Sequence, residues 1–372
     1  MLLAAQRHQP TPDRIEEDLL SAPTARRRTL GATVAATTAL LLAAGCTSNE
    51  PPQEENDGGA TGQAAGGGTA NDEPGDTVVI GFSAPAADHG WMGAITQTAL
   101  DTAEQLEDVE LRQAEATNDV NVQISQVEQF INDGVDAIVL LPFDGAALTP
   151  VALQAMEAGI PVVNVDREFS SPFAARATIL GDNYGIGVSA GTYICEQLGD
   201  NPGAVVAEIQ GIASLPLTQD RSEGFADALG DCGLNVDHQV SADFTVQGGE
   251  TATSNLLQAA PRIDAVWNHD DDQGVGVLAA IENAGRDEFI MVGGAGSLDV
   301  MEHIQAGDPP LEATVIYPST QAADGIKLAR LIVQNKSMSD LVSAGVPRTT
   351  QLHAPVVTQE NVEQYLPVGF RS

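Results

Sequence analysis

The sequence predicts a doubly wound α/β chain in two parallel-sheet lobes. Apolar runs rich in valine and isoleucine alternate with amphipathic stretches such as 120–131 and 251–257. Apolar strands that alternate with helices are typical of parallel sheets covered on both faces. Removing an export signal and a polar tether leaves about 295 residues, enough for two lobes of ordinary domain size. The expected strands are 78–82, 109–113, 137–141, 162–165, 204–209, 265–267, 289–292 and 314–317.

The N-terminal segment, 1–46, predicts export from the cytoplasm. Three arginines at 26–28 precede an apolar run of small residues and leucines that ends at Cys46. A basic region followed by about 15 apolar residues and a small-residue cleavage point makes a secretory signal, because the run is too short for a comfortable membrane span. The Ala-Ala-Gly-Cys ending resembles a bacterial lipobox, which implies that Cys46 carries a lipid. The arginines are compatible with Sec or twin-arginine export.

A polar segment follows the signal at 47–76, rich in Asn, Glu, Pro, Gly and Thr. It cannot bury enough apolar surface to order itself, so we expect a flexible tether between the lipid and the domain. The net charge of -36, from 52 acidic against 16 basic residues, argues against nucleic acid or an anionic membrane surface as a partner, because the field repels phosphate. The acidity fits an ordinary exported protein or a saline habitat, and the sequence leaves both open.

The chain has three cysteines, and lipidation of Cys46 leaves Cys195 and Cys232 in an oxidising compartment. An even remainder favours a disulfide between neighbouring helix ends, with two buried free thiols as the alternative. Neither cysteine lies in a motif with a candidate base, so a catalytic thiol is not expected.

Polar residues follow several predicted strands, at the edge where an open α/β sheet binds ligands. Ser83 ends the first strand, and the loop behind it contains Asp88 and Trp91. This loop has no glycine-rich dinucleotide motif, which argues against a nucleotide-binding fold. Asp166 and Arg167 follow the fourth strand, where a carboxylate and a guanidinium can bind neighbouring hydroxyls as acceptor and donor.

Two separated segments, 162–167 and 208–225, resemble the ribose-binding branch of the periplasmic sugar-binding proteins, a type I fold shared with the lactose repressor. The resemblance implies that the chain crosses between the lobes three times, near 181–183, 317–318 and 349–352. A few such crossing residues can act as hinges that close two lobes around a ligand. The implied N-terminal lobe is 77–181 plus 318–349, and the C-terminal lobe is 182–317 plus 350–372.

The same resemblance implies which residues contact the ligand. Trp91 and Phe244 would face a sugar ring, whose C–H side suits a broad apolar surface. Two departures change the expected hydroxyl pattern: 293–296 is Gly-Gly-Ala-Gly where the family carries a carboxylate, and Tyr317 replaces a hinge glutamine. They argue against ribose itself, because sites built on hydrogen bonds reject mismatched hydroxyls. The implied contacts are Ser83, Asp88, Trp91, Asp166, Arg167, Arg221, Phe244, Asp270 and Tyr317.

Asp270 also begins an acid-rich run, 270–272, and stands where ribose binders carry asparagine. A cation site is the alternative interpretation of this run. The run lacks the spacing of a loop that binds hard cations and coincides with the expected sugar-contact strand end, so no metal is expected.

The predicted function is that of a substrate-binding lipoprotein of an ABC importer, a monomer that captures a small polyhydroxylated ligand and presents it to a permease. Sugar, polyol and cyclitol remain open. No enzyme is predicted and no cofactor is expected, because the chain lacks a nucleophile elbow, a phosphate loop and a zinc-binding helix motif. A transcriptional regulator of this fold would need a helix-turn-helix in place of the signal. A receptor that feeds a membrane signalling partner is the alternative that the sequence leaves open.

Overall fold

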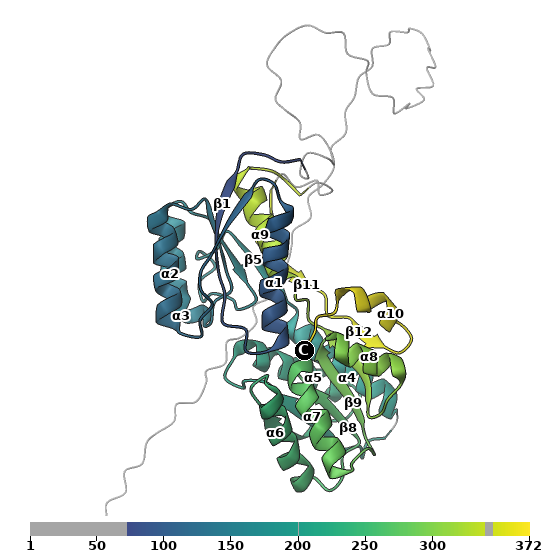
Figure 1. Ribbon diagram of the computed structural model, residues 1–372. Coiled ribbons are helices and arrows are strands. Elements are labelled where there is room, and N and C mark those ends of the chain that lie inside the picture. The colour runs from purple at the N-terminus through teal and green to yellow at the C-terminus, as the bar shows by residue number, and fades with distance from the viewer. Residues whose placement is uncertain (1–72, 200, 339–344) are drawn as a thin grey trace, which may run out of the picture. The chain divides into compact units, whose positions relative to one another are not determined.

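The computed structural model describes residues 73–199, 201–338 and 345–372. These residues form two six-stranded sheets, each covered by helices (Figure 1). The predicted α/β class with two parallel-sheet lobes is confirmed. Within the described part of the chain, no helix is both long enough and apolar enough to cross a membrane.

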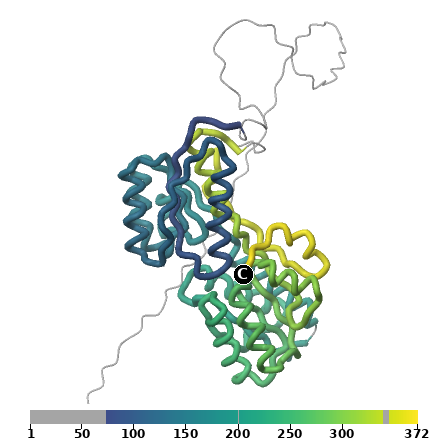
Figure 2. Tube along the Cα trace, viewed as in Figure 1, coloured from purple at the N-terminus to yellow at the C-terminus, as the bar shows by residue number. Residues whose placement is uncertain are grey.

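The first lobe is a fully parallel sheet in the order β11-β5-β4-β3-β1-β2. Helices α1 and α9 pack together on one face, and α2 and α3 pack together on the other (Figure 1). Figure 2 shows α9 beside α1, although the two come from opposite ends of the described chain. The elements of this lobe are β1 (Val78–Ser83), α1 (Gly90–Gln105), β2 (Val109–Gln113), α2 (Val120–Asp133), β3 (Ala137–Leu140), α3 (Gly145–Glu157), β4 (Val162–Val165), β5 (Ala177–Gly181), α9 (Gln321–Val333) and β11 (Thr349–Leu352).

The second lobe has the strand order β12-β10-β9-β8-β6-β7. All neighbours are parallel except β12, which runs antiparallel to β10. Helices α4 and α5 pack against each other, as do α6 and α7. The elements are α4 (Asn183–Leu198), β6 (Val206–Gln210), α5 (Pro216–Asp231), β7 (Val236–Ser241), α6 (Val246–Ala259), β8 (Ala265–Asn268), α7 (Asp271–Ala284), β9 (Ile290–Ala295), α8 (Leu298–Ala306), β10 (Leu311–Ile316), β12 (Val356–Thr358), α10 (Val362–Tyr365) and a 3₁₀ turn (Leu366–Val368).

Local chemistry sets where these elements begin and end. Every residue of β3 and β4 is buried, as expected for central strands covered on both faces. Helix α2 begins after Asp119, whose carboxylate accepts hydrogen bonds from two first-turn N–H groups, and ends at Gly134 in the left-handed conformation. Asp270 caps α7 in the same way. The cap therefore fixes Asp270 at the carboxyl end of β8, where ligands bind in this class of sheet.

The sequence does not predict β5, β7, β11 or β12. β7 and β11 are edge strands in which more and less exposed residues alternate, so they lack the continuous apolar run that marks the central strands. β5 contains only two large apolar residues, Ile179 and Leu180, and β12 is three residues long. Runs this short carry little periodic signal.

The structure moves the third crossing between the lobes. β11 pairs in parallel with β5 and so belongs to the first sheet. The predicted boundary at 350 is too early, and the chain crosses at 353–355 instead. It enters the second lobe at the carboxyl edge of that sheet. A strand that starts there must run back along β10, which explains the antiparallel pairing of β12.

The predicted signal and Cys46 lie outside the described residues, as does most of the predicted tether. Its last four residues, 73–76, are a correction to the prediction because the domain holds them. The Glu73 carbonyl accepts hydrogen bonds from Arg330 at 2.9 Å and Lys336 at 2.8 Å, and the Gly75 N–H donates to Asp108 at 2.6 Å. The Arg330 guanidinium, 2.6 Å from Asp108, holds the pKa of that buried carboxyl well below its usual range.

Candidate functional site

Loops from both lobes meet at a small cavity of about 30 Å³. Seven of the nine predicted ligand residues line it, together with three residues that the sequence did not single out as contacts. An adjoining cleft of about 570 Å³ shares three of its residues, so the two form one region, with a volume in the range of small-molecule sites. The predicted residues in the cavity are Trp91, Asp166, Arg167, Arg221, Phe244, Asp270 and Tyr317, and the others are His89, Met92 and Leu217.

The first lobe contributes a paired acceptor and donor at the end of β4. Asp166 is 4% exposed, and its carboxylate lies 3.8 Å from the Nε of Arg167. One terminal nitrogen of Arg167 donates to the Phe143 carbonyl at 2.7 Å, which fixes the guanidinium. Its buried Nε has no hydrogen-bond partner among the described residues. A ligand oxygen would satisfy this donor, whose isolation in the interior is otherwise costly.

A continuous hydrogen-bonded chain links this pair to the second lobe. The Tyr317 hydroxyl donates to Asp166 Oδ1 at 2.6 Å and accepts from Asn183 Nδ2 at 3.1 Å. Asn183 Oδ1 in turn accepts from Arg221 Nε at 3.0 Å. Burial raises the pKa of Tyr317, and the Asp166 charge adds to this, so the phenol remains neutral and can donate. The sequence did not predict Asn183; its place at the first crossing, buried at the start of α4, is the only signal it offers.

Arg221 is the centre of the second-lobe side. It is 3% exposed, and one terminal nitrogen donates to the His269 carbonyl at 3.0 Å. Its guanidinium carbon lies 4.5 Å from the centre of the Tyr317 ring and 6.0 Å from that of Phe244, within the range of cation–π attraction. The Phe244 ring packs closely against Gly211, where an added Cβ would lie 2.0 Å from the ring. The glycine makes room for the aromatic face.

Trp91 packs against Tyr317 with ring centres 5.3 Å apart. Its indole N–H donates to the Tyr317 carbonyl at 3.0 Å, which satisfies the polar edge of a side chain that is only 5% exposed. The Trp91 ring is therefore held in the cavity by a hydrogen bond to Tyr317, a residue of the crossing segment, as well as by apolar packing.

The first loop differs from the prediction. Ser83 is fully buried beneath the site, where its hydroxyl donates to Gln126 at 2.9 Å and accepts from Gln123 at 3.1 Å. Asp88 also lies outside the cavity, half exposed, and its carboxylate is 2.6 Å from His89 Nδ1. His89 faces the cavity instead and stacks on Phe244, with ring centres 6.2 Å apart. The sequence did not single out His89 as a contact, because spacing does not show which of two adjacent side chains points inward.

Electrostatics distinguish the acidic residues after β8. Burial, together with the charge of Asp272, raises the pKa of Asp270 to about 7. Burial opposes the charged form of His89, but the hydrogen bond to Asp88 and the charge of Asp270 together raise its pKa. Asp271 faces away from the cavity, where its carboxylate accepts from the N–H groups of 294, 296 and 297 and from the Thr314 hydroxyl. Its role is therefore structural.

The acid-rich run that offered a cation site is thus already engaged by protein donors. Among the described residues, no group of histidine, cysteine or carboxylate side chains has an arrangement that could hold a metal ion. Cys195 and Cys232 form a disulfide from the last turn of α4 to the end of α5, with Cα atoms 6.1 Å apart.

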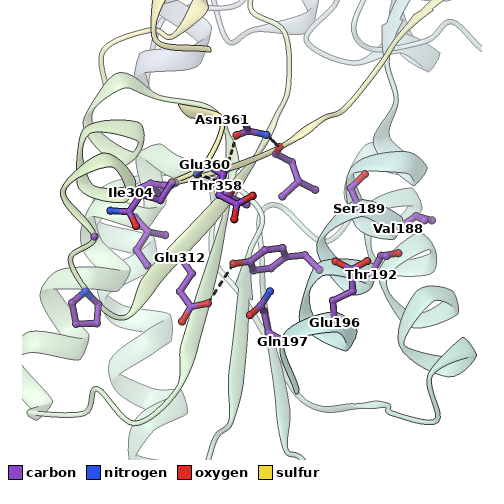
Figure 3. A pocket seen from close by; sticks show the side chains of 16 residues that line it. Val188, Ser189, Thr192, Glu196, Gln197, Ile304, Glu312, Thr358, Glu360 and Asn361 are labelled. Atoms are coloured by element: carbon purple, nitrogen blue, oxygen red, sulfur yellow. Dashed lines mark hydrogen bonds between the residues drawn. The ribbon is translucent and has the colours of Figure 1, made fainter. Parts of the chain in front are cut away.

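A larger cavity lies elsewhere, as a groove of about 870 Å³ bordered by α4, β10 and β12 (Figure 3). Its side chains include Glu196, Glu312 and Glu360 but none of the predicted ligand residues. The Tyr193 hydroxyl donates to Glu312 at 3.3 Å, and burial and that carboxylate raise the pKa of Tyr193 to about 12. Volume alone would favour this groove. Converging buried donors, acceptors and aromatic faces favour the smaller site.

The chain is similar to known proteins over most of its described length. The family model for a periplasmic binding protein domain matches residues 80–337. The ribose import binding protein of Bacillus subtilis is 34% identical over 244 residues, which cover 64% of this chain and 76% of that protein. A solved ABC transporter solute-binding protein from Bacillus halodurans with bound myo-inositol is 25% identical, with a TM-score of 0.70 over 78% of this chain and 98% of its own. The fructose-binding periplasmic domain of a hybrid two-component system is 27% identical, with a TM-score of 0.68 over 78% and 93% of the respective chains.

Proposed function

The chain belongs to the periplasmic binding protein family, and from that premise we propose that it is the substrate-binding component of an ABC importer. It would capture a sugar or a related polyol or cyclitol between its two lobes and deliver it to a membrane permease. The family consists of binding proteins, and the proposal assigns no chemical reaction to the site.

The observation that carries the proposal is the convergence of polar and aromatic groups from both lobes on one cavity. Asp166 supplies acceptors, Arg167 and Arg221 supply donors, and Trp91 and Phe244 supply ring faces. This set matches the needs of a polyhydroxylated ring, which presents hydroxyls at its edge and C–H groups on its face. A ribose import protein and a myo-inositol-bound protein among the relatives support the same ligand class.

A ligand screen by thermal shift tests the function. Ribose, xylitol, myo-inositol and fructose are each added to the purified protein. A ligand present at about 100 times its Kd stabilises the native state by about 2.7 kcal/mol, so we expect a shift of several degrees for one of them. No shift for any sugar, polyol or cyclitol in an extended panel would contradict the proposed ligand class.

The polar clamp is tested with the ligand that the screen identifies. Arg167→Ala should weaken binding by about 10- to 150-fold, because hydrogen bonds to a charged group are worth about 1.5–3 kcal/mol. Arg176→Ala is the matched control, since that arginine also donates to a backbone carbonyl of the first lobe but does not line the cavity. Titration calorimetry measures both variants. If both variants bind the ligand with equal affinity, Arg167 does not contact the ligand and the binding site lies elsewhere.

We further propose that the protein is extracytoplasmic and anchored by a lipid on Cys46, on the strength of the lipobox-like residues 43–46. Cys46→Ala should release the protein from the membrane fraction into the medium. A wild-type protein that is already free and lacks acyl mass at its N-terminus would contradict the anchor.

A receptor that hands its occupied state to a membrane sensor is the second candidate. It is supported by the similarity to the fructose-binding domain of a two-component system. Co-purification from detergent extracts distinguishes the two functions, since an importer component should associate with a permease and a receptor with a sensor kinase.

A further inference from the structure

Helix α1, which follows the first loop of the first lobe, has no cap of its own. His89 occupies the N-cap position, but its side chain makes no capping hydrogen bond, and the first turn contains no acidic residue. The Gly93 N–H bonds to the His89 carbonyl, so the N–H groups of 90–92 are the ones without a partner inside the helix. Buried donors at a helix N-terminus require an acceptor from elsewhere.

The second lobe supplies that acceptor. Asp272, in the first turn of α7, accepts a hydrogen bond from the Trp91 backbone N–H at 2.8 Å. Trp91 is the second residue of α1, and a capping side chain normally bonds the N–H of the second or third helical residue. Asp272 therefore caps α1 from the other lobe, with its negative charge at the positive end of the helix dipole.

The two helix ends are in close contact at this point. Asp272 is 3% exposed, and its second oxygen, Oδ1, is buried without a hydrogen-bond partner among the described residues. A Cβ added to Gly90 would lie 2.6 Å from that oxygen and 2.5 Å from the Arg371 carbonyl. Figure 1 shows the C-terminal end of the chain beside this end of α1. Only glycine at position 90 allows the second lobe to come this close.

In this arrangement the Trp91 N–H of the first lobe donates a hydrogen bond to the buried Asp272 carboxylate. The described residues provide it with no ion pair to lysine or arginine, and a buried carboxylate that is not hydrogen-bonded is costly. Separation of the lobes would return the carboxylate and the Trp91 N–H to water and remove the cap. The contact therefore stabilises the closed arrangement specifically.

We propose that Asp272 is an interlobe latch, a positioning residue that caps α1 across the gap and biases the two lobes toward closure without lining the ligand cavity. Asp272 is absent from the residues around that cavity. The latch raises the fraction of empty protein that is closed. Since a ligand gains its full contacts only in the closed state, a larger closed fraction raises the apparent affinity for the ligand. It acts in the empty protein and does not depend on which sugar the site takes.

Distances between spin labels on the two lobes test the latch. Labels are placed by Gln97→Cys on α1 and Asn283→Cys on α7, both exposed positions, in the full chain carrying Cys46→Ser. Pulsed dipolar spectroscopy gives the ratio of closed to open molecules, in the absence of ligand and with saturating ribose, xylitol or myo-inositol. Asp272→Ala should lower this ratio about 5-fold, the equivalent of the ~1 kcal/mol typical of a helix cap.

Three further variants separate capping from charge and from general destabilisation. Asp272→Asn should keep the ratio within about 2-fold of wild type, because asparagine caps as well as aspartate does. Glu282→Ala, which removes an exposed acid from the same helix, should leave the ratio unchanged. Gly90→Ala should lower the ratio from the opposite lobe, because its Cβ would meet Asp272, and it keeps the test decisive if Asp272→Ala fails to fold.

Identical distance distributions for wild type, Asp272→Ala and Gly90→Ala would overturn the proposal. A wild-type protein that shows no closed component in any condition would also overturn it. Failure of the three added compounds to shift the wild-type ratio would count against the proposed ligand class and not against the latch, whose effect is measured without ligand.

Discussion

Replacing Tyr317 by phenylalanine removes one oxygen from the centre of the network that joins the lobes. That hydroxyl donates to Asp166 at 2.6 Å and accepts from Asn183 at 3.1 Å, and the side chain is 3% exposed. The ring of the phenylalanine can keep its stacking on Trp91 and under Arg221. The substitution therefore changes hydrogen bonding with little change in volume.

The magnitude follows from the two bonds that are lost. The bond to the Asp166 carboxylate is charge-assisted, worth about 1.5–3 kcal/mol, and the bond from the Asn183 amide is neutral, worth about 0.5–1.5 kcal/mol. Water cannot easily replace either bond at this depth. Tyr317→Phe should therefore lower the free energy of unfolding by about 2–4.5 kcal/mol.

Urea unfolding, followed together by circular dichroism and tryptophan fluorescence, measures this loss from the midpoint and the m-value. Tyr184→Phe is the matched control, since its hydroxyl also donates to an aspartate, Asp227, at 2.8 Å, but the side chain is 43% exposed. Water replaces that bond, so the control should lose less than about 1 kcal/mol. If Tyr317→Phe lowers the free energy of unfolding no more than the control does, the Tyr317 hydroxyl is not central to the hydrogen-bond network between the lobes.

Three other changes have defined outcomes. Asp270→Asn should raise the melting temperature more at pH 8 than at pH 5: the folded pKa of about 7 exceeds the usual 3.8, so the contribution of Asp270 to stability is full below about pH 4 and is lost as the pH rises to 7. Replacing both Cys195 and Cys232 by alanine should cost about 4 kcal/mol of unfolding free energy by the loop-entropy relation for their separation of 37 residues, and an unchanged urea midpoint would contradict this. Gly211→Ala should abolish ligand binding in calorimetry by displacing the Phe244 ring.

The central strands could be predicted from sequence because burial on both faces leaves a continuous apolar signal. β1 to β4 fall within one residue of the expected positions. The edge strands β7, β11 and β12 were missed, although the edge strand β2 was predicted, because an edge strand needs apolar residues on one face at most, and β11 consists largely of polar residues. The third crossing between the lobes was placed too early for the same reason. β11 was not recognised as a strand, so its residues were assigned to the connection between the lobes.

Residues that line the candidate cavity could be predicted where a polar group follows a strong strand, as Asp166 and Arg167 follow β4. It was less predictable in the loop before α1, where the choice among Ser83, Asp88 and His89 depends on how the loop folds. The sequence did not single out Asn183 or Asp272, because Asn183 contacts the Tyr317 hydroxyl and Asp272 contacts the Trp91 N–H, both far away along the chain. Such contacts join residues more than 100 positions apart, and no local pattern marks them.

The backbone conformation of two site residues explains why their side chains converge. In an extended strand, consecutive side chains point to opposite faces, yet Asp166 and Arg167 line the same cavity. Asp166 has a φ of 64°, and this left-handed residue breaks the alternation at the end of β4. Phe244 has a φ of 67°, which is rare for a bulky residue and costs about 1–3 kcal/mol.

Tertiary contacts maintain these conformations. The Asp166 N–H donates to the Ile179 carbonyl of the neighbouring strand, and the Phe244 N–H donates to the Gln273 side chain at 3.1 Å. Each bond comes from another element of the same lobe, so the orientation of the side chain is a property of the assembled lobe. Residue type at a strand end therefore indicates which groups are available to a ligand, whereas the direction in which they point is decided only once the sheet and its covering helices are in place.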